Sequence, residues 1–351
     1  MTREPIAFAP FQTPTKIAVL GAGSWGTALA ALLAANGHSP YLWARNPELA
    51  NALRADGENR RYLPGIPLPN TIFPTADLCE ALSDAPVVLF AVPSGAMRQT
   101  AADAYPLLHP GALLISASKG LEDTTGLRMS QILSQTIPCS QSRTVALSGP
   151  NLAVEVARGI PTASVAAASN LEAARAVQRL FLEQPTPVFR VYTGTDVIGV
   201  ELAGAIKNVI AIAAGVCDGM GYGDNAKAAI MTRGLAEAVR LGISQGAQMQ
   251  TFLGLSGVGD LIATGASRLS RNYRVGFALG EGRSLPDILR EIGQVAEGVP
   301  TARALFVLAQ GHQVDMPLCA SLNAVLFEGR TARDLIGELL VRPPKDESSG
   351  L

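Results

Sequence analysis

The stretch KIAVLGAGSWGTALAALLAANGH, residues 16–38, decides the fold of the first half of the chain. It opens with a short apolar run, stops at Gly21, and continues as a helical pattern of small and aliphatic residues that ends at Gly37. Between the two lies GAGSWG, residues 21–26, which matches the pattern G-x-G-x-x-G. Glycine turns are common, but a turn placed between a strand and a helix is typical of sites where backbone N–H groups hold a pyrophosphate.

Each glycine of this motif has a predicted role. Gly21 permits the turn, Gly23 lets phosphates approach the backbone, and Gly26 allows the helix to pack closely on the strand. A site selective for NAD usually has Asp or Glu about 20 residues further on, to bind the ribose hydroxyls. Here that position is Arg45, whose guanidinium cannot accept those hydrogen bonds but can pair with a 2′-phosphate or stack on adenine. We therefore expect NADP to be accepted; because Arg45 can also be an ordinary surface charge, NAD stays open.

The pattern beyond this motif predicts two domains. Apolar runs without polar alternation predict further buried strands, at residues 40–45, 86–92, 112–118, 144–149 and 162–169. After about Thr193 strand signals vanish, and helical patterns occupy residues 195–217, 224–244, 272–281, 285–292, 299–312 and 317–328. We expect an α/β domain, a Rossmann-like doubly wound sheet that binds a dinucleotide, at residues 16–192, and an all-α substrate domain at residues 193–341. The termini, residues 1–15 and 342–351, look like loose polar arms.

Composition excludes several classes of function. A net charge of -1 on 351 residues provides no general field for nucleic acid or an anionic membrane. The 4 cysteines and 3 histidines are dispersed, so neither a metal site nor a disulfide framework is expected. The first sixteen residues lack the apolar segment of a signal peptide, and the longest uncharged runs are broken by glycine. We expect a cytoplasmic protein that recognises small molecules at specific sites.

A lysine stands alone in the apolar stretch ELAGAIKNVIAIAAGV, residues 201–216. On a helix Lys207 shares its face with small residues, whereas the neighbouring stripe of heavier residues is predicted core. A single helical lysine is usually a surface residue whose stem lies along apolar side chains, but no other charge occurs from Leu202 to Cys217. Because a buried ammonium is costly, we expect Lys207 to be paired or kept for its chemistry. The small face leaves room for another backbone or for a ligand.

Other polar residues fit the same chemistry. An enzyme that oxidises an alcohol with a nicotinamide needs a group that takes the hydroxyl proton, and a lysine with a lowered pKa can do this. Lys119 follows a predicted strand at the ligand-binding edge of the sheet, and a second cation would lower that pKa and suit an anionic substrate. Ser270, Arg271 and Asn272 precede a predicted helix and can surround a phosphate, although an N-cap with an exposed arginine is the simpler interpretation. Asp260 can orient Lys207 or bind a substrate hydroxyl, or merely form a turn.

These residues together resemble the bacterial type of NAD(P)-dependent sn-glycerol-3-phosphate dehydrogenase. The similarity runs from IAVLGAGSWGTALA through SKGLE, LSGP, ELAGAIKNVIAIAAG, GYGDNAKAA and SRN, over roughly residues 16–341. It implies an enzyme that interconverts dihydroxyacetone phosphate and sn-glycerol 3-phosphate, usually to supply phospholipid synthesis. It assigns proton transfer to Lys207, and substrate contacts to Lys119, Gly149, Asp260, Ser270, Arg271 and Asn272. It assigns cofactor contacts to Ser24, Trp25, Arg45, Lys119, Ala153, Arg271, Val295 and Glu297.

One departure from the family's pattern concerns the residues after LSGP. The family usually has a small hydroxyl residue followed by an aromatic there, and this chain has Asn151 and Leu152. Asn151 can still hydrogen-bond a substrate, so the resemblance implies altered affinity rather than another reaction. Two alternatives stay open: a 3-hydroxyacid or 6-phosphogluconate type dehydrogenase, which would require a carboxylate substrate, and a sensor that binds NAD(P) without turnover. A homodimer is also left open.

Overall fold

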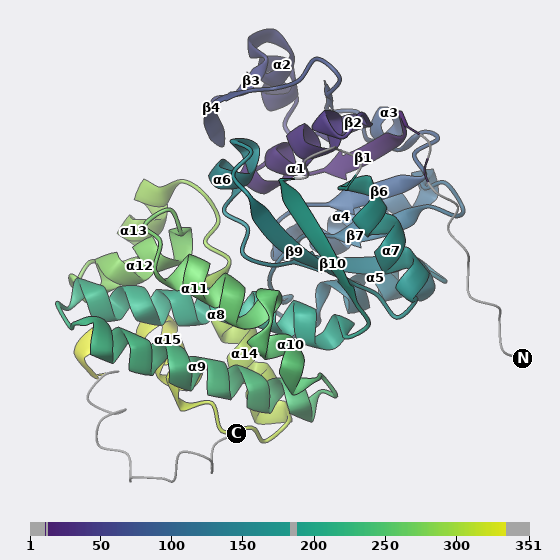
Figure 1. The fold of residues 1–351 in the computed structure, drawn as a ribbon. Coiled ribbons are helices and arrows are strands. Elements are labelled where there is room, and N and C mark those ends of the chain that lie inside the picture. Colours follow the sequence, from purple (N-terminus) through teal and green to yellow (C-terminus); the bar gives the residue numbers. More distant parts are fainter. Residues whose placement is uncertain (1–10, 12, 183–187, 335–351) are drawn as a thin grey trace, which may run out of the picture. The chain divides into compact units, whose positions relative to one another are not determined.

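The computed structural model describes residues 11, 13–182 and 188–334. The expected loose arm at residues 1–15 lies largely outside the described residues, and the expected tail at 342–351 lies wholly outside them. The chain divides into two compact units, coloured along the sequence in Figure 1. The first comprises Met1–Ser118 and Met129–Val197, and the second comprises Lys119–Arg128 and Ile198–Leu351. The ten-residue excursion Lys119–Arg128 into the second unit has no counterpart in the sequence patterns.

The first unit is built on a mostly parallel sheet, which confirms the predicted α/β class. Among the described residues it has eight strands in the order β10-β9-β8-β7-β6-β1-β2-β5, and only the β8–β9 pair is antiparallel. The strands are β1 (Lys16–Leu20), β2 (Ser39–Trp43), β5 (Phe73–Thr75), β6 (Val87–Phe90), β7 (Leu113–Ser116), β8 (Thr144–Ser148), β9 (Thr162–Ala167) and β10 (Phe189–Gly194), with a separate pair β3 (Glu58–Asn59) and β4 (Leu63–Pro67). Every strand expected from an apolar run is present.

The strand order reverses at β1, because the chain continues to β2 on one side and later places β6 on the other. Crevices at such a reversal, outside the carboxyl ends of the strands, bind ligands in open α/β sheets. Helix α1 begins at Ser24, immediately beyond that end of β1. The helices of this unit are α1 (Ser24–Ala35), α2 (Pro47–Asp56), α3 (Leu78–Leu82), α4 (Met97–Ala104), α5 (Met129–Thr136), α6 (Ala153–Ala157) and α7 (Leu171–Leu180).

Apart from the loop Lys119–Arg128, the regular elements of the second unit are helical over its described residues, as predicted. Its elements are α8 (Val197–Gly219), α9 (Asp224–Ser244), α10 (Met249–Leu253), a π-helical turn (Leu255–Gly259), α11 (Asp260–Gly265), α12 (Arg271–Gly280), α13 (Leu285–Ile292), α14 (Gly298–Gly311) and α15 (Pro317–Phe327). The six helical ranges expected from periodicity correspond to α8, α9 and α12–α15. The short elements between Met249 and Gly265 were not predicted, because glycines interrupt the helical pattern there.

Helix α8 runs through the middle of the helical unit (Figure 1), and every residue from Gly199 to Cys217 is buried. Among the described helices, only α8 is long and apolar enough to cross a membrane. However, 89% of its most apolar window is buried within the protein, as in the core helix of a globular unit. Side chains from α9, α12, α14 and α15 surround it and form one continuous apolar core.

Helices α8 and α12 pack backbone against backbone. The contact is made by glycines on both helices, namely Gly215 and Gly219 on α8 and Gly276 and Gly280 on α12. A Cβ atom built on any of them would lie 1.8–2.5 Å from a carbonyl oxygen of the opposite helix. No side chain fits at such a distance, so these four glycines set how closely α12 approaches α8.

Candidate active site and cofactor-binding turn

The glycine turn of the first unit is constrained by its own backbone. Gly21 has φ +116°, which favours glycine, and a Cβ there would lie 2.7 Å from the Ala91 carbonyl oxygen. A Cβ on Gly26 would lie 1.9 Å from the Gly21 carbonyl oxygen, so the first turn of α1 sits tightly on the turn. Around Gly23, in contrast, no described atom lies within 4 Å of an added Cβ. The open side of the turn is therefore where a ligand can approach the backbone.

The N-terminus of α1 has the features of an anion site. Its N-cap is Gly23, and within the described residues no side chain caps the first N–H groups. The Ser24 hydroxyl is engaged, because Oγ donates to the Tyr62 carbonyl oxygen at 2.7 Å. Buried Asn59 braces the turn: its Nδ2 donates to the Ala22 carbonyl oxygen at 3.0 Å. The backbone N–H groups of the first helical turn are thus the donors available to a ligand.

Three other residues expected to contact the cofactor lie in the first unit. Trp25 packs in a small cluster with Ala153, so the structure brings these two predicted positions together. The indole N–H of Trp25 is buried and has no partner within the described part of the chain. Arg45 is exposed, one residue before the Asn46 N-cap of α2 and just beyond the end of β2. Its side chain is accessible to a phosphate from solvent.

Gly149 and Asn151 follow strand β8. Gly149 has φ +149°, and a Cβ there would lie 2.9 Å from the Ala163 carbonyl oxygen, so glycine is required. The side-chain amide of Asn151 is held against β9: its Oδ1 accepts from Ser164 Oγ at 3.0 Å. Its Nδ2 donates to the Ala163 carbonyl oxygen at 3.4 Å. The residue that departs from the family pattern is therefore fixed in orientation by its neighbours on β9.

Lys207 lies at the centre of a buried polar cluster in the second unit. Its Nζ donates to Asp260 Oδ1 at 3.0 Å and to Thr264 Oγ1 at 2.8 Å. The other carboxylate oxygen of Asp260 accepts from Lys119 Nζ at 2.8 Å. Lys207 is 8% exposed and Asp260 is 1% exposed, so one carboxylate shared by two ammonium groups is almost withdrawn from solvent. The surface interpretation of Lys207 is therefore wrong.

The environment lowers the pKa values of both Lys207 and Asp260, for different physical reasons. Burial lowers the pKa of Lys207 to about 8, because it disfavours the ammonium form; Lys119 and Arg271 act in the same direction and Asp260 against it. Burial alone would raise the pKa of Asp260, but the charges of Lys119 and Lys207 outweigh it and hold that pKa below its ordinary value. The cluster keeps a permanent carboxylate next to an amine that titrates near neutrality.

A second chain of hydrogen bonds connects this cluster to helix α12. Asn208, the residue after Lys207, donates from Nδ2 to the Lys119 carbonyl oxygen at 3.4 Å. Its Oδ1 accepts from Asn272 Nδ2 at 2.8 Å, and Asn272 Oδ1 accepts from the Gly298 N–H at 2.9 Å. Predicted site residue Asn272 is therefore a bridge between α8, α12 and the start of α14.

Ser270 and Arg271 lie at the N-terminus of α12. Ser270 is the N-cap, and its Oγ accepts from the Tyr273 N–H at 3.2 Å, which matches the simpler interpretation of this residue. Arg271 is half-buried rather than exposed, and its Nη1 donates to Gln294 Oε1 at 3.4 Å. Burial lowers the pKa of Arg271 while the nearby charge of Glu297 raises it. Val295, another residue to which the resemblance assigns a cofactor contact, is 46% exposed.

Sequence reasoning missed Thr264 and Asn208. Thr264 lies four residues after Asp260 on α11, so both side chains face Lys207, and its Oγ1 also donates to Asp260 Oδ1 at 3.1 Å. The four-residue spacing of Asp260 and Thr264 could have indicated that their side chains share a helix face. It indicates this only once a helix is recognised inside the glycine-rich stretch. Among the described residues, no group of three or more His, Cys, Asp or Glu could hold a metal ion.

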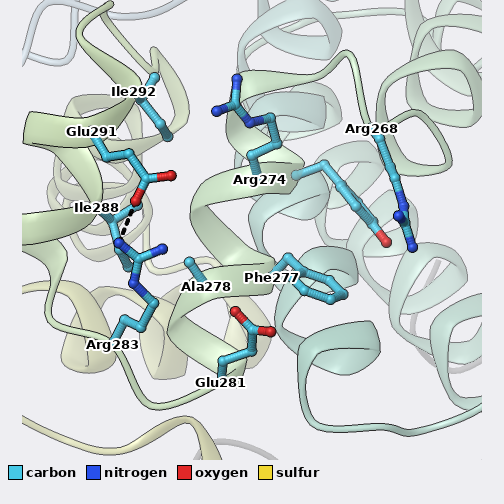
Figure 2. Close-up of a pocket in the computed structure, with 10 residues that line it drawn as sticks. Arg268, Arg274, Phe277, Ala278, Glu281, Arg283, Ile288, Glu291 and Ile292 are labelled. Carbon is cyan, nitrogen blue, oxygen red and sulfur yellow. Dashed lines mark hydrogen bonds and ion pairs between the residues drawn. The ribbon is translucent and has the colours of Figure 1, made fainter.

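A separate pocket of about 260 Å³ lies beside α12 and α13 (Figure 2). Its rim carries Arg268, Arg274 and Arg283, and an ion pair joins Arg283 to Glu291. No residue of the Lys207 cluster lines it. This pocket is therefore distinct from the candidate active site.

Comparisons with known proteins agree with the motifs. The family model for the NAD-dependent glycerol-3-phosphate dehydrogenase N-terminus matches residues 16–174. The family model for its C-terminus matches residues 196–337. The glycerol-3-phosphate dehydrogenase (NAD(P)+) of Moorella thermoacetica is 50% identical over 331 residues, covering 94% of this chain and 97% of that protein. That of Chlorobium limicola is 49% identical, covering 94% and 99%. The crystal structure of glycerol-3-phosphate dehydrogenase from Coxiella burnetii superposes with a TM-score of 0.88 at 38% identity, covering 95% of this chain and 100% of that one.

Proposed function

We propose that this chain, which belongs to the NAD-dependent glycerol-3-phosphate dehydrogenase family, interconverts dihydroxyacetone phosphate and sn-glycerol 3-phosphate with NAD(P)H or NAD(P)+. The observation that carries the proposal is the buried Lys207–Asp260–Lys119 cluster. A buried amine whose pKa lies near neutrality is suited to exchange a proton with a substrate oxygen, and the second cation suits an anionic substrate.

The turn at residues 21–26 fits a dinucleotide. Gly21 and Gly26 leave no space for side chains, Gly23 is open, and the uncapped start of α1 offers N–H donors for a pyrophosphate. When bound, the reduced nicotinamide supplies the hydride that the reaction requires. The resemblance also assigns cofactor contacts to Ser24, Trp25 and Ala153, and to Lys119, Arg271, Val295 and Glu297.

Lys207 is the proposed proton donor and acceptor. In the reduction it gives a proton from Nζ to the carbonyl oxygen of dihydroxyacetone phosphate; in the oxidation the neutral amine takes the proton back. Asp260 and Thr264 accept hydrogen bonds from Nζ and fix its position. Lys119 holds the other oxygen of Asp260 and faces the anionic substrate with a positive charge. These contacts keep the amine oriented while its charge changes.

The substrate phosphate is proposed to bind at the start of α12. There Arg271 supplies a guanidinium for bidentate pairing, and the helix N-terminus adds its backbone N–H groups. Ser270 and Asn272 flank it, although the hydroxyl of Ser270 and the amide of Asn272 already make the hydrogen bonds described above. Gly149 and Asn151 are assigned substrate contacts by resemblance alone, and altered affinity at Asn151 remains a prediction.

Exposed Arg45 supports acceptance of NADPH, because a 2′-phosphate can pair with its guanidinium. Replacement of Arg45 by Ala is expected to raise the KM for NADPH and leave the KM for NADH nearly unchanged. Steady-state kinetics with both cofactors measures this, and an equal change for both would contradict the assignment. Supply of glycerol 3-phosphate to phospholipid synthesis, a cytoplasmic location and a homodimer are further parts of the proposal, each open to direct measurement.

The decisive experiment compares the wild type with Lys207→Ala. The wild type should oxidise NAD(P)H with dihydroxyacetone phosphate, and the variant should lose turnover, by about 100-fold or more, while binding cofactor normally. A 3-hydroxyacid or 6-phosphogluconate type enzyme would instead require a carboxylate substrate in a substrate panel. Cofactor binding without turnover by the wild type would point to a sensor and refute the proposed reaction.

A further inference from the structure

The segment Lys119–Arg128 is a closed loop that belongs to the helical unit although its neighbours in sequence do not. Its two ends are joined by an isolated antiparallel bridge between Leu121 and Arg128. Within it the Glu122 N–H donates to the Leu127 carbonyl oxygen at 3.0 Å. Leu121 is fully buried in the core cluster around α8. The loop thus has a defined shape and carries Lys119 at its first position.

Besides the Lys119–Asp260 contact, two ion pairs attach this loop to helices, in contrasting environments. Arg128 Nη1 lies 2.6 Å from Glu201 Oε2 of α8, and these side chains are only 13% and 6% exposed. Arg303 Nη1 lies 3.5 Å from Asp123 Oδ2, and these side chains are 51% and 36% exposed. Exposed pairs contribute little, whereas a buried pair constrains geometry because losing one partner leaves an uncompensated charge in the interior.

We propose that the buried Arg128–Glu201 pair positions Lys119, so that Glu201 and Arg128 act on proton transfer through Lys119 and Asp260 without touching the substrate. This inference rests on the proposed function. The pair fixes the end of the loop against α8, on the same helix that carries Lys207 six residues after Glu201. The bridge from Arg128 to Leu121 then transmits the constraint to the start of the loop, where Lys119 Nζ contacts Asp260.

The charges that face Lys207 decide the sign of the effect. They are Asp260 on α11, Lys119 on the loop and Arg271 on α12. When Lys119 moves away, Lys207 loses a neighbouring cation and its pKa rises. Removal of the Glu201 carboxylate alone would act the other way, because losing a negative charge lowers the pKa of a nearby amine. An upward shift therefore distinguishes positioning from direct electrostatics.

The test uses Glu201→Gln in the full chain, with Asp123→Asn at the exposed pair as the matched control. We expect kcat/KM for sn-glycerol 3-phosphate to fall by about 10- to 100-fold, as displacements of about an ångström can cause. The midpoint of the pH profile should move to higher pH, and Asp123→Asn should match the wild type. In Arg128→Lys, which keeps the positive charge, part of the wild-type rate should be retained.

A double-variant cycle tests whether Glu201 acts through Lys119. In a Lys119→Met background, Glu201→Gln should cause little further loss, because the group it positions is already absent. Additive losses, or a lower melting temperature with the wild-type pH midpoint, would overturn the inference. If Glu201→Gln does not fold, Arg128→Lys with and without Lys119→Met gives the same comparison. Absence of turnover in the wild type would instead refute the proposed function.

Discussion

Raising the pH through the pKa of Lys207 should have opposite effects on the two directions of the reaction. Burial lowers this pKa from 10.5 to about 8, a shift that corresponds to about 3 kcal/mol in favour of the neutral amine. At pH 7 about a tenth of the enzyme then carries neutral Lys207, against about one part in three thousand for an unperturbed lysine. The structure therefore supplies roughly a 300-fold larger pool of active base.

The assay is kcat/KM as a function of pH for both directions. Oxidation of sn-glycerol 3-phosphate needs the neutral amine, so its kcat/KM should rise about tenfold per pH unit and level off above pH 8. Reduction of dihydroxyacetone phosphate needs the ammonium, so its kcat/KM should be level and then fall above pH 8. The phosphate group of the substrate titrates at about pH 6, well below the bends expected near pH 8. A flat oxidation profile from pH 6.5 to 9.5, or bends in the same sense for both directions, would refute the role of Lys207.

Two further predictions concern stability. Gly276→Ala places a Cβ 1.8 Å from the Ile212 carbonyl oxygen and should destabilise the protein by about 3 kcal/mol or more, measured by chemical denaturation. Gly311→Ala, where no described atom lies within 4 Å of the added Cβ, should be neutral or slightly stabilising, and similar losses for both would contradict the packing argument. Burial raises the pKa of Glu237 from 4.5 to about 7, although the hydrogen bonds that its carboxylate accepts from the N–H groups of Leu318 and Cys319 act to lower it. Because its pKa is higher in the folded than in the unfolded state, Glu237 contributes to the free energy of unfolding fully below pH 4.5. This contribution of about 3 kcal/mol is lost as the pH rises through 7. Relative to Glu237→Gln, the wild type should therefore lose free energy of unfolding between pH 4.5 and 7; parallel curves for the two proteins would exclude this.

Local patterns predicted most of the fold. The strand, turn and helix at residues 16–38 are recognisable because each depends on residues adjacent in sequence, and the helices α9 and α13 have the predicted bounds. Strand β10 was missed because it alternates buried and exposed residues, unlike the apolar runs of the central strands. The excursion Lys119–Arg128 was missed because it depends on distant contacts, such as Leu121 in the core of the helical unit.

The candidate site was predictable where a residue type is out of place. Lys207 is conspicuous because its helix is otherwise apolar, and Asp260 and Lys119 were expected near it as charged residues in glycine-rich or strand-end contexts. The structure brings these three together. Thr264 and Asn208 carry no charge and occur in any helix, so their hydrogen bonds to this cluster follow only from the tertiary fold.

The interrupted course of the chain limits how the two halves can be recombined. A fragment starting at Ile198 would lack Leu121, whose fully buried side chain belongs to the core of the helical unit. It would also lack Lys119, whose ammonium group contacts Asp260. A hybrid that joins this helical half to a dinucleotide-binding half of different origin therefore has to carry residues 119–128 as an insert between β7 and α5. Recombination at a single crossover near residue 197 would therefore exchange Lys207 and Asp260 together but leave Lys119 with the other parent.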